Sequence, residues 1–321
     1  MGLMVKRVLL ASPRGYCAGV ERAVDTVEKL LDLHGPPVYV RKQIVHNAHV
    51  VRDLEARGAV FVDDEREVPE GETVVLSAHG VAPEVYGNAQ ARGLTTIDAT
   101  CPLVAKVHVQ ARRYAADGYT ILLIGHAGHE EVVGTMGEAP DATILVQSVT
   151  DAEALDLAPD ARVAYITQTT LSVDETGEII QALRRRFPQI HAPKKEDICY
   201  ATSNRQWAVK DLLEEVELLL VIGSSNSSNS NRLVEVARAS GVAAHLIDDE
   251  SDIDEAWLDE AETVGVTSGA SAPEKLVERV CDWFRAHGVQ EISARRIVDE
   301  DVEFRLPVEL RRELTLAESQ S

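Results

Sequence analysis

The sequence has no excess of positive charge. Its 32 lysines and arginines stand against 53 aspartates and glutamates, which gives a formal net charge of −21 over 321 residues. This balance argues against nucleic acid as a partner and against anionic membrane surfaces, because both require basic residues on the binding face. A phosphate ligand would therefore have to be bound by a local group of residues.

Long apolar runs are also missing. No stretch reaches the roughly 18 consecutive apolar residues that a membrane-crossing helix needs, and the first residues lack the apolar core and cleavage site of a signal peptide. We therefore expect no membrane association and a cytoplasmic location. At about 150 residues per domain, the length predicts two or three domains.

Cysteines are few and widely separated, at positions 17, 101, 199 and 281. This spacing excludes a small disulfide-rich scaffold, and in a reducing compartment the four residues remain thiols that bind metal or pack in the core. Cys281 shares a helical apolar face with Leu276, Val280 and Phe284. We expect Cys281 to be a core residue.

Apolar runs of strand length alternate with amphipathic helical runs along the chain, which predicts an α/β fold with mostly parallel sheets. The alternation comes in three rounds, so we expect three similar α/β lobes. The predicted parts are a first lobe at 1–101, a second lobe at 102–196, a third lobe at 197–287 and a C-terminal tail at 288–321. The last dozen residues are expected to be frayed.

Cys17, Cys101 and Cys199 each lie just before a predicted helix. A thiol at a helix start has a lowered pKa, which favours the thiolate that binds metal. The three sulfurs would meet if the three rounds pack about a pseudo-threefold axis. They could then hold zinc, or three irons of a [4Fe–4S] cluster whose fourth iron is left for substrate. The absence of a paired C-x-x-C motif favours the cluster.

Polar side chains gather where predicted strands end and helices begin, which is where open α/β sheets bind ligands and where helix N-termini attract anions. Helix capping would also explain serine and asparagine at these positions. Because one helix end contributes little, several must converge, and a diphosphate fits that need better than a monoanion. The residues concerned are His46, His79, His129, Ser227, Ser228, Asn229 and Ser271.

Glu131 and Thr169 are the candidates for acid–base chemistry in the same set of loops. A glutamate at a helix start is more often a surface residue that stabilises the helix dipole. With a pKa of about 4.3, only about one carboxyl in 500 is protonated at pH 7. A proton donor at Glu131 therefore requires a raised pKa, which an enclosed site and a nearby diphosphate would both provide.

These motifs resemble those of the 4-hydroxy-3-methylbut-2-enyl diphosphate reductases, iron–sulfur enzymes that catalyse the last step of the methylerythritol phosphate route to isoprenoids. The resemblance runs from about Pro13 to Pro273. It rests on Pro13-Arg14-Gly15-Tyr16-Cys17-Ala18-Gly19-Val20, Ile44-Val45-His46-Asn47, Ser77-Ala78-His79-Gly80, Asp98-Ala99-Thr100-Cys101-Pro102, the segment from His129 to Thr135, Thr167-Gln168-Thr169-Thr170-Leu171-Ser172, Ile198-Cys199, the run from Ser227 to Arg232, and Ser268-Gly269-Ala270-Ser271-Ala272-Pro273.

The resemblance implies a three-lobed trefoil around one [4Fe–4S] cluster per chain, with Cys17, Cys101 and Cys199 as ligands and one open iron. It implies that the seven polar residues above bind the diphosphate, that Thr169 lies near the substrate hydroxyl and that Glu131 supplies a proton. The implied reaction is reductive dehydroxylation of the allylic diphosphate to isopentenyl and dimethylallyl diphosphate. A ferredoxin or flavodoxin is the implied electron donor.

Two other classes of function remain open from the residues alone. A non-enzymatic iron–sulfur redox sensor would share the three cysteines but would not need the diphosphate-binding residues. A zinc hydrolase acting on a diphosphate would be colourless and indifferent to oxygen. The acidic segment after about Ile297 matches no motif of the family.

Overall fold

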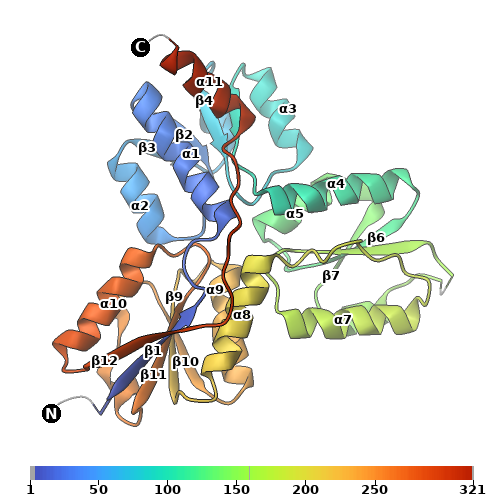
Figure 1. The fold of residues 1–321 in the computed structure, drawn as a ribbon. Helices are drawn as coiled ribbons and strands as arrows, with labels where there is room; N and C mark the ends of the chain where they lie inside the picture. The colour runs from blue at the N-terminus through green and yellow to red at the C-terminus, as the bar shows by residue number, and fades with distance from the viewer. Residues whose placement is uncertain (1–3, 159, 320–321) are drawn as a thin grey trace. The chain divides into compact units, whose positions relative to one another are not determined.

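The computed structural model describes residues 4–158 and 160–319, so residues 1–3 of the predicted first lobe and 320–321 of the predicted tail lie outside it. The strands are β1 (Arg7–Ser12), β2 (Val38–Arg41), β3 (Ala59–Val62), β4 (Thr73–Leu76), β5 (Thr95–Asp98), β6 (Thr120–Ile124), β7 (Thr143–Val146), β8 (Val163–Thr167), β9 (Leu218–Ile222), β10 (Ala243–Ile247), β11 (Thr263–Ser268) and β12 (Glu291–Arg296). Figure 1 shows their order along the chain.

The α-helices alternate with these strands, as the sequence predicts. They are α1 (Ala18–His34), α2 (Ala48–Ala56), α3 (Pro83–Ala91), α4 (Pro102–Ala116), α5 (Glu130–Gly137), α6 (Val149–Ala154), α7 (Val173–Arg186), α8 (Tyr200–Leu212), α9 (Ser228–Ala239), α10 (Glu274–Ala286) and α11 (Val308–Glu318). Short 3₁₀ turns occur at Glu65–Glu67, Pro140–Ala142, Glu250–Asp252 and Glu255–Leu258. Within the described residues, no helix is both long and apolar enough to cross a bilayer.

The strands form three parallel sheets, with the orders β10-β9-β11-β1-β12, β3-β2-β4-β5 and β7-β6-β8. The predicted α/β class with three lobes is therefore confirmed. The chain divides into two compact units. The first comprises residues through Ala18, His46–Val50 and Tyr200–Val302, and the second comprises Gly19–Val45, Val51–Cys199 and the residues from Glu303.

The first unit contains the five-stranded sheet, which is covered on both faces. Alternate residues of β1 point to opposite faces, because the side-chain period of a strand is two. Val8 and Leu10 pack with α10, where Cys281 is buried as predicted, whereas Leu9 and Ala11 pack with α8. In Figure 1, α10 and α8 accordingly lie on opposite sides of the sheet.

The second unit contains the other two sheets. In the three-stranded sheet, Leu122 and Ile124 of β6 pack with α6 and α7, whereas Ile121 and Leu123 pack with α4 and α5. The four-stranded sheet packs Val74 of β4 against Ala89 of α3. The central strand of the three-stranded sheet is therefore buried on both faces.

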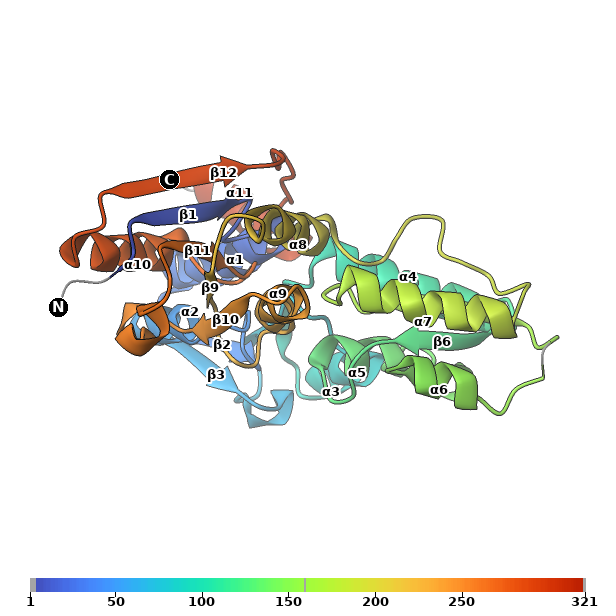
Figure 2. The ribbon, with the colours of Figure 1, turned by 90° about the horizontal axis from the view of Figure 1, so that it is seen from below.

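The pairing of β1 brings distant parts of the sequence into one sheet. β1, from the predicted first lobe, pairs with β11 and β12 in the five-stranded sheet (Figure 2). In this register Val8 lies opposite Val264 of β11 and Ile292 of β12. The expectation of a frayed end is wrong, since α11 forms there and buries Leu310. The lobe ranges themselves, 1–101, 102–196 and 197–287 with a tail at 288–321, remain predictions.

Two glycines allow the ends of β9 and β11 to approach the first turn of α9. A Cβ atom added to Gly223 or Gly269 would overlap the hydroxyl of Ser230, which is completely buried. By contrast, Gly177 in α7 has nothing within 4 Å of such an atom.

We predict that Gly269→Ala lowers the free energy of unfolding by about 1–3 kcal/mol, because the added methyl group must displace buried atoms. The matched change Gly177→Ala should raise it by about 0.5–1 kcal/mol, since alanine loses less backbone entropy than glycine in a helix. Urea unfolding followed by circular dichroism measures both. Equal effects of the two substitutions would contradict the close packing at Gly269.

Candidate functional site

The predicted polar residues follow the strands at which each sheet reverses its order. In β7-β6-β8 the chain reverses between β6 and β8, and Glu131 and Thr169 lie in the segments that follow these strands. In the five-stranded sheet the reversal lies between β9 and β11, whose following segments contain Ser227 and Ser271. In the four-stranded sheet, His79 follows β4 at the corresponding position. Parallel α/β sheets bind ligands at such switch points.

The three predicted cysteine ligands share one environment. Cys17, Cys101 and Cys199 are half-buried thiols that lie immediately before α1, α4 and α8. Cys17 and Cys101 follow a strand closely, whereas Cys199 follows an irregular segment. Cys281 differs from them, because it is fully buried and burial raises the pKa of its thiol.

The backbone N–H of each of these three cysteines donates to a carbonyl in a loop that contains a predicted substrate-binding residue. The pairs are Cys17 N to Ala270 O (3.3 Å), Cys101 N to Ala78 O (2.9 Å) and Cys199 N to Thr169 O (3.0 Å). Ala270 precedes Ser271 and Ala78 precedes His79 in the chain, and Thr169 is itself a predicted site residue. Each cysteine is thus tied by one backbone hydrogen bond to one part of the polar set.

Glu131 is buried at the start of α5 and is held by Thr169. Its Oε1 accepts the backbone N–H of Thr169 at 2.7 Å, and its Oε2 accepts the Thr169 hydroxyl at 3.0 Å. Burial raises the pKa of Glu131 to about 7, although both hydrogen bonds from Thr169 act to lower it. Close to half of the carboxyls are therefore protonated at neutral pH, which an exposed glutamate cannot achieve.

His129 caps the helix that carries Glu131. Its Nδ1 accepts the backbone N–H of Glu131 at 3.2 Å, which requires the neutral ring to carry its proton on Nε2. Burial and the neighbouring His79 lower the pKa of His129 to about 4. At neutral pH the ring is therefore uncharged and its Nε2–H is a donor.

His79 and Glu130 lie beside this cap. The rings of His79 and His129 meet edge to face, with centroids 6.0 Å apart. The Nδ1 of His79 lies 3.3 Å from a carboxylate oxygen of Glu130. Burial acts to raise the pKa of Glu130, but the hydrogen bond and charge of His79 outweigh it and hold the pKa below its usual value. Of the two neighbouring acids, Glu130 is thus ionised at neutral pH, whereas Glu131 is only partly ionised.

The polar residues of the first unit also make hydrogen bonds within that unit. Ser227 caps α9 by accepting the N–H of Ser230, so the helix-capping interpretation holds for this hydroxyl. Asn229 accepts the N–H of Ala270 at 2.9 Å, and Ser271 donates to the carbonyl of His46 at 2.8 Å. Ser228 is the half-buried first residue of α9.

Sequence reasoning missed Asp197, a buried acid two residues before Cys199. It accepts a hydrogen bond from Lys106 of α4 at 3.0 Å and another from the N–H of Thr167 at 3.2 Å. Burial raises the pKa of Asp197, against the effect of Lys106. The only signal in the sequence is an acidic residue just before a cysteine, which is too common to indicate burial.

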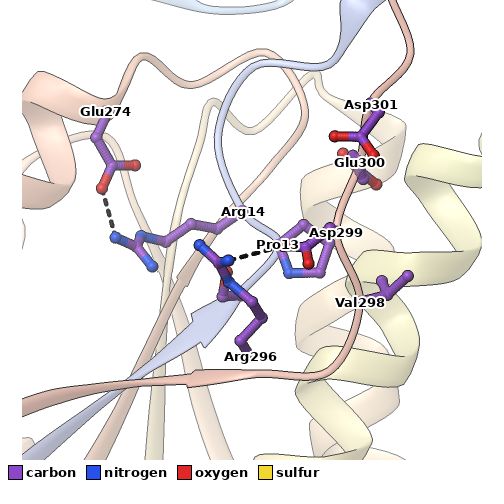
Figure 3. A pocket seen from close by; sticks show the side chains of 9 residues that line it. Pro13, Arg14, Glu274, Arg296, Val298, Asp299, Glu300 and Asp301 are labelled. Carbon is purple, nitrogen blue, oxygen red and sulfur yellow. Dashed lines mark hydrogen bonds and ion pairs between the residues drawn. The ribbon is translucent and has the colours of Figure 1, made fainter.

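A polar cavity of about 360 Å³ lies in the first unit between Ser12–Arg14 and Val298–Asp301 (Figure 3). Arg14 pairs with Glu274 at 2.5 Å, and Arg296 pairs with Asp299 at 2.7 Å. None of the predicted substrate-binding residues lines this cavity, so it is not the candidate site.

Comparison with known proteins gives consistent matches over nearly the whole chain. The family model described as LytB protein matches residues 8–298. The chain is 63% identical over 313 residues to a 4-hydroxy-3-methylbut-2-enyl diphosphate reductase of Acidothermus cellulolyticus, covering 96% of this chain and 91% of that protein. It is 56% identical over 310 residues to the reductase of that name from Streptomyces coelicolor, with coverage of 96% and 92%.

Solved structures agree with these matches. The E-1-hydroxy-2-methyl-but-2-enyl-4-diphosphate reductase from Plasmodium falciparum superposes with a TM-score of 0.95 at 38% identity, covering 98% of this chain and 99% of that one. A second reductase, titled as the terminal enzyme of the non-mevalonate pathway, gives a TM-score of 0.62 at 31% identity, with coverage of 88% and 100%. The chain therefore belongs to the LytB family, the family of the 4-hydroxy-3-methylbut-2-enyl diphosphate reductases.

Proposed function

We propose that this chain reduces (E)-4-hydroxy-3-methylbut-2-enyl diphosphate to isopentenyl and dimethylallyl diphosphate, the terminal step of the non-mevalonate pathway. The relatives named for this reaction support the proposal, since they match 96% of the chain at up to 63% identity. The structural observation behind it is the set of backbone hydrogen bonds that tie three thiols to three loops of polar residues.

Cys17, Cys101 and Cys199 would hold the cofactor. Three half-buried thiols are the donor set that a [4Fe–4S] cluster with one open iron requires. When bound, the cluster supplies electrons one at a time and offers the open iron to the substrate hydroxyl as a Lewis acid. Cys281 is unsuited to this role because it lies on the buried apolar face of α10.

The diphosphate would be bound by His46, His79, His129, Ser227, Ser228, Asn229 and Ser271. His129 supports this role most clearly, because its neutral ring keeps a donor on Nε2 while Nδ1 caps α5. Uncharged donors and helix N-termini can bind an anion in a protein whose net charge is −21. No general positive field is needed.

Glu131 would deliver the proton through Thr169. Because Oε1 accepts a backbone N–H, the proton of the acid resides on Oε2, the oxygen that faces the Thr169 hydroxyl. A protonated Oε2 donates to Thr169 Oγ1, which can then donate its own proton to the departing substrate oxygen. The pKa of about 7 allows Glu131 to release this proton and recover it near neutral pH.

The electrons would come from a ferredoxin or flavodoxin.

Several half-buried thiols that must stay reduced suit a cytoplasmic location.

We predict that Glu131→Gln abolishes most turnover of the allylic diphosphate while substrate and cofactor binding persist, since glutamine keeps the shape but cannot donate a carboxylic proton. In the wild type, turnover should fall roughly tenfold for each pH unit above about 7, as the acid loses its proton. The assay is anaerobic turnover with a strong chemical reductant. Undiminished turnover of the variant would remove Glu131 from the mechanism.

The raised pKa of Glu131 also predicts how the free energy of unfolding depends on pH. Its pKa is raised from about 4.3 in the unfolded chain to about 7 in the fold, so stability falls as pH rises through this window and levels off above it. Glu131→Gln removes this dependence. Its free energy of unfolding relative to the wild type should therefore rise by roughly 3 kcal/mol between pH 4 and pH 8, as measured by urea unfolding.

The substitution His129→Asn distinguishes the role of His129 as the cap of α5 from its proposed role in binding the diphosphate. Asparagine is a good N-cap, so stability should change little, whereas His129→Ala should cost about 1 kcal/mol. Both variants lose the Nε2–H donor, and each should raise KM for the diphosphate roughly tenfold or more. Steady-state kinetics with urea unfolding of both variants checks this, and an unchanged KM would exclude His129 from substrate binding.

A further inference from the structure

Each predicted cysteine ligand is preceded by backbone carbonyls that accept hydrogen bonds from one cationic side chain. Arg205 donates to Gly15 O at 2.6 Å and to Tyr16 O at 3.3 Å, just before Cys17. Arg22 donates to Thr100 O at 3.0 Å and Asp98 O at 3.1 Å, just before Cys101. Lys106 donates to Lys195 O at 3.0 Å and Glu196 O at 2.8 Å, just before Cys199.

Each of the three cations lies in the helix that begins after one cysteine and donates to the segment before a different cysteine. Arg22 lies in α1, which begins after Cys17, and it holds the segment before Cys101. Lys106 lies in α4, which begins after Cys101, and it holds the segment before Cys199. Arg205 lies in α8, which begins after Cys199, and it holds the segment before Cys17. The three contacts therefore close a cycle along the chain.

The cationic side chains differ in how deeply they are buried. The side chain of Arg205 is 0% exposed and is paired with Glu300 at 3.1 Å. Glu300 belongs to the segment that faces Pro13 and Arg14 across the cavity in Figure 3. Lys106 is paired with the fully buried carboxylate of Asp197.

The acidic segment after Ile297, which matches no motif, has a structural role in this arrangement. Glu300 accepts hydrogen bonds from both Arg205 and Asn204, and the carbonyl of Arg305 accepts one from Arg22 at 2.8 Å. Ile297 N donates to Ser12 O, at the end of β1. Two of the three cations thus bond to the C-terminal segment as well as to a cysteine loop.

We propose that Arg22, Lys106 and Arg205 are positioning residues that fix the three cysteine loops. Their positive charges also set the electrostatic environment of the cofactor that the three cysteines bind. The proposal rests on the proposed function, because it takes the three cysteines as cluster ligands. Mutation of outer-shell groups that orient metal ligands typically lowers metal affinity by about 10- to 100-fold. Positive charge near a cluster favours its reduced, more negative state and so raises its reduction potential.

The test uses the full chain purified without oxygen and needs no turnover. The charge-removing variants are Arg22→Gln, Lys106→Gln and Arg205→Gln, and the charge-retaining variants are Arg22→Lys, Lys106→Arg and Arg205→Lys. Lys29→Gln and Arg113→Gln are matched controls, because these exposed cations lie on α1 and α4 away from the cysteine loops. Two quantities are measured: the rate of iron release to a chelator, and the midpoint potential of the cluster by an EPR-monitored titration.

We expect each charge-removing variant to release iron roughly tenfold faster than the wild type and to show a more negative midpoint potential. The charge-retaining variants should recover most of the wild-type potential. Because Arg205→Gln leaves buried carbonyls and Glu300 without a cation, Glu300→Gln is the second variant for this site. It removes a negative charge and should shift the potential in the positive direction.

Iron release and potentials equal to those of the two control variants would overturn the inference. Faster iron release at an unchanged potential, with no shift in Glu300→Gln, would overturn its electrostatic part and reduce the cations to structural residues. A wild-type protein without an iron–sulfur cluster would instead refute the proposed function.

Discussion

The site depends on backbone hydrogen bonds from the cysteines to the loops that contain the polar residues. Cys101 N donates to Ala78 O and Cys199 N donates to Thr169 O, so in the second unit each cysteine is linked by one hydrogen bond to the segment that contains His79 or Thr169. The bond from Cys17 N to Ala270 O links Cys17 in the same way to the segment that contains Ser271 in the first unit. The positions of the proposed metal ligands and of the proposed substrate-binding residues are therefore linked by hydrogen bonds within each unit.

Burial shifts the pKa values of the ionisable side chains at the start of α5, an effect that composition does not reveal. Glu130 and Glu131 are neighbours in sequence, yet His79 keeps the pKa of Glu130 low while burial raises that of Glu131 to about 7. The same burial keeps His129 neutral, with its acceptor nitrogen committed to the helix cap. The start of the short helix α5 thus holds an ionised acid, a partly protonated acid and an uncharged imidazole.

Local sequence patterns predicted the α/β class, the three rounds and the position of Cys17, Cys101 and Cys199 before helices, because strand and helix periodicity and capping act over a few residues. They did not predict that β1 pairs with β11, since strand pairing is set by packing over the whole chain. The contacts of Lys106 and Arg205 were missed for the same reason. Their spacing of five and six residues after a cysteine has meaning only once the segments that they hold are known.

The central claim is that three of the four thiols hold one iron–sulfur cofactor. Assay of iron and acid-labile sulfide, with a visible spectrum, on protein purified without oxygen tests it most directly. We predict a [4Fe–4S] complement in the wild type and in Cys281→Ser, and its loss in Cys101→Ser. A full complement in Cys101→Ser, or a colourless wild type that contains zinc in place of iron, would contradict the account.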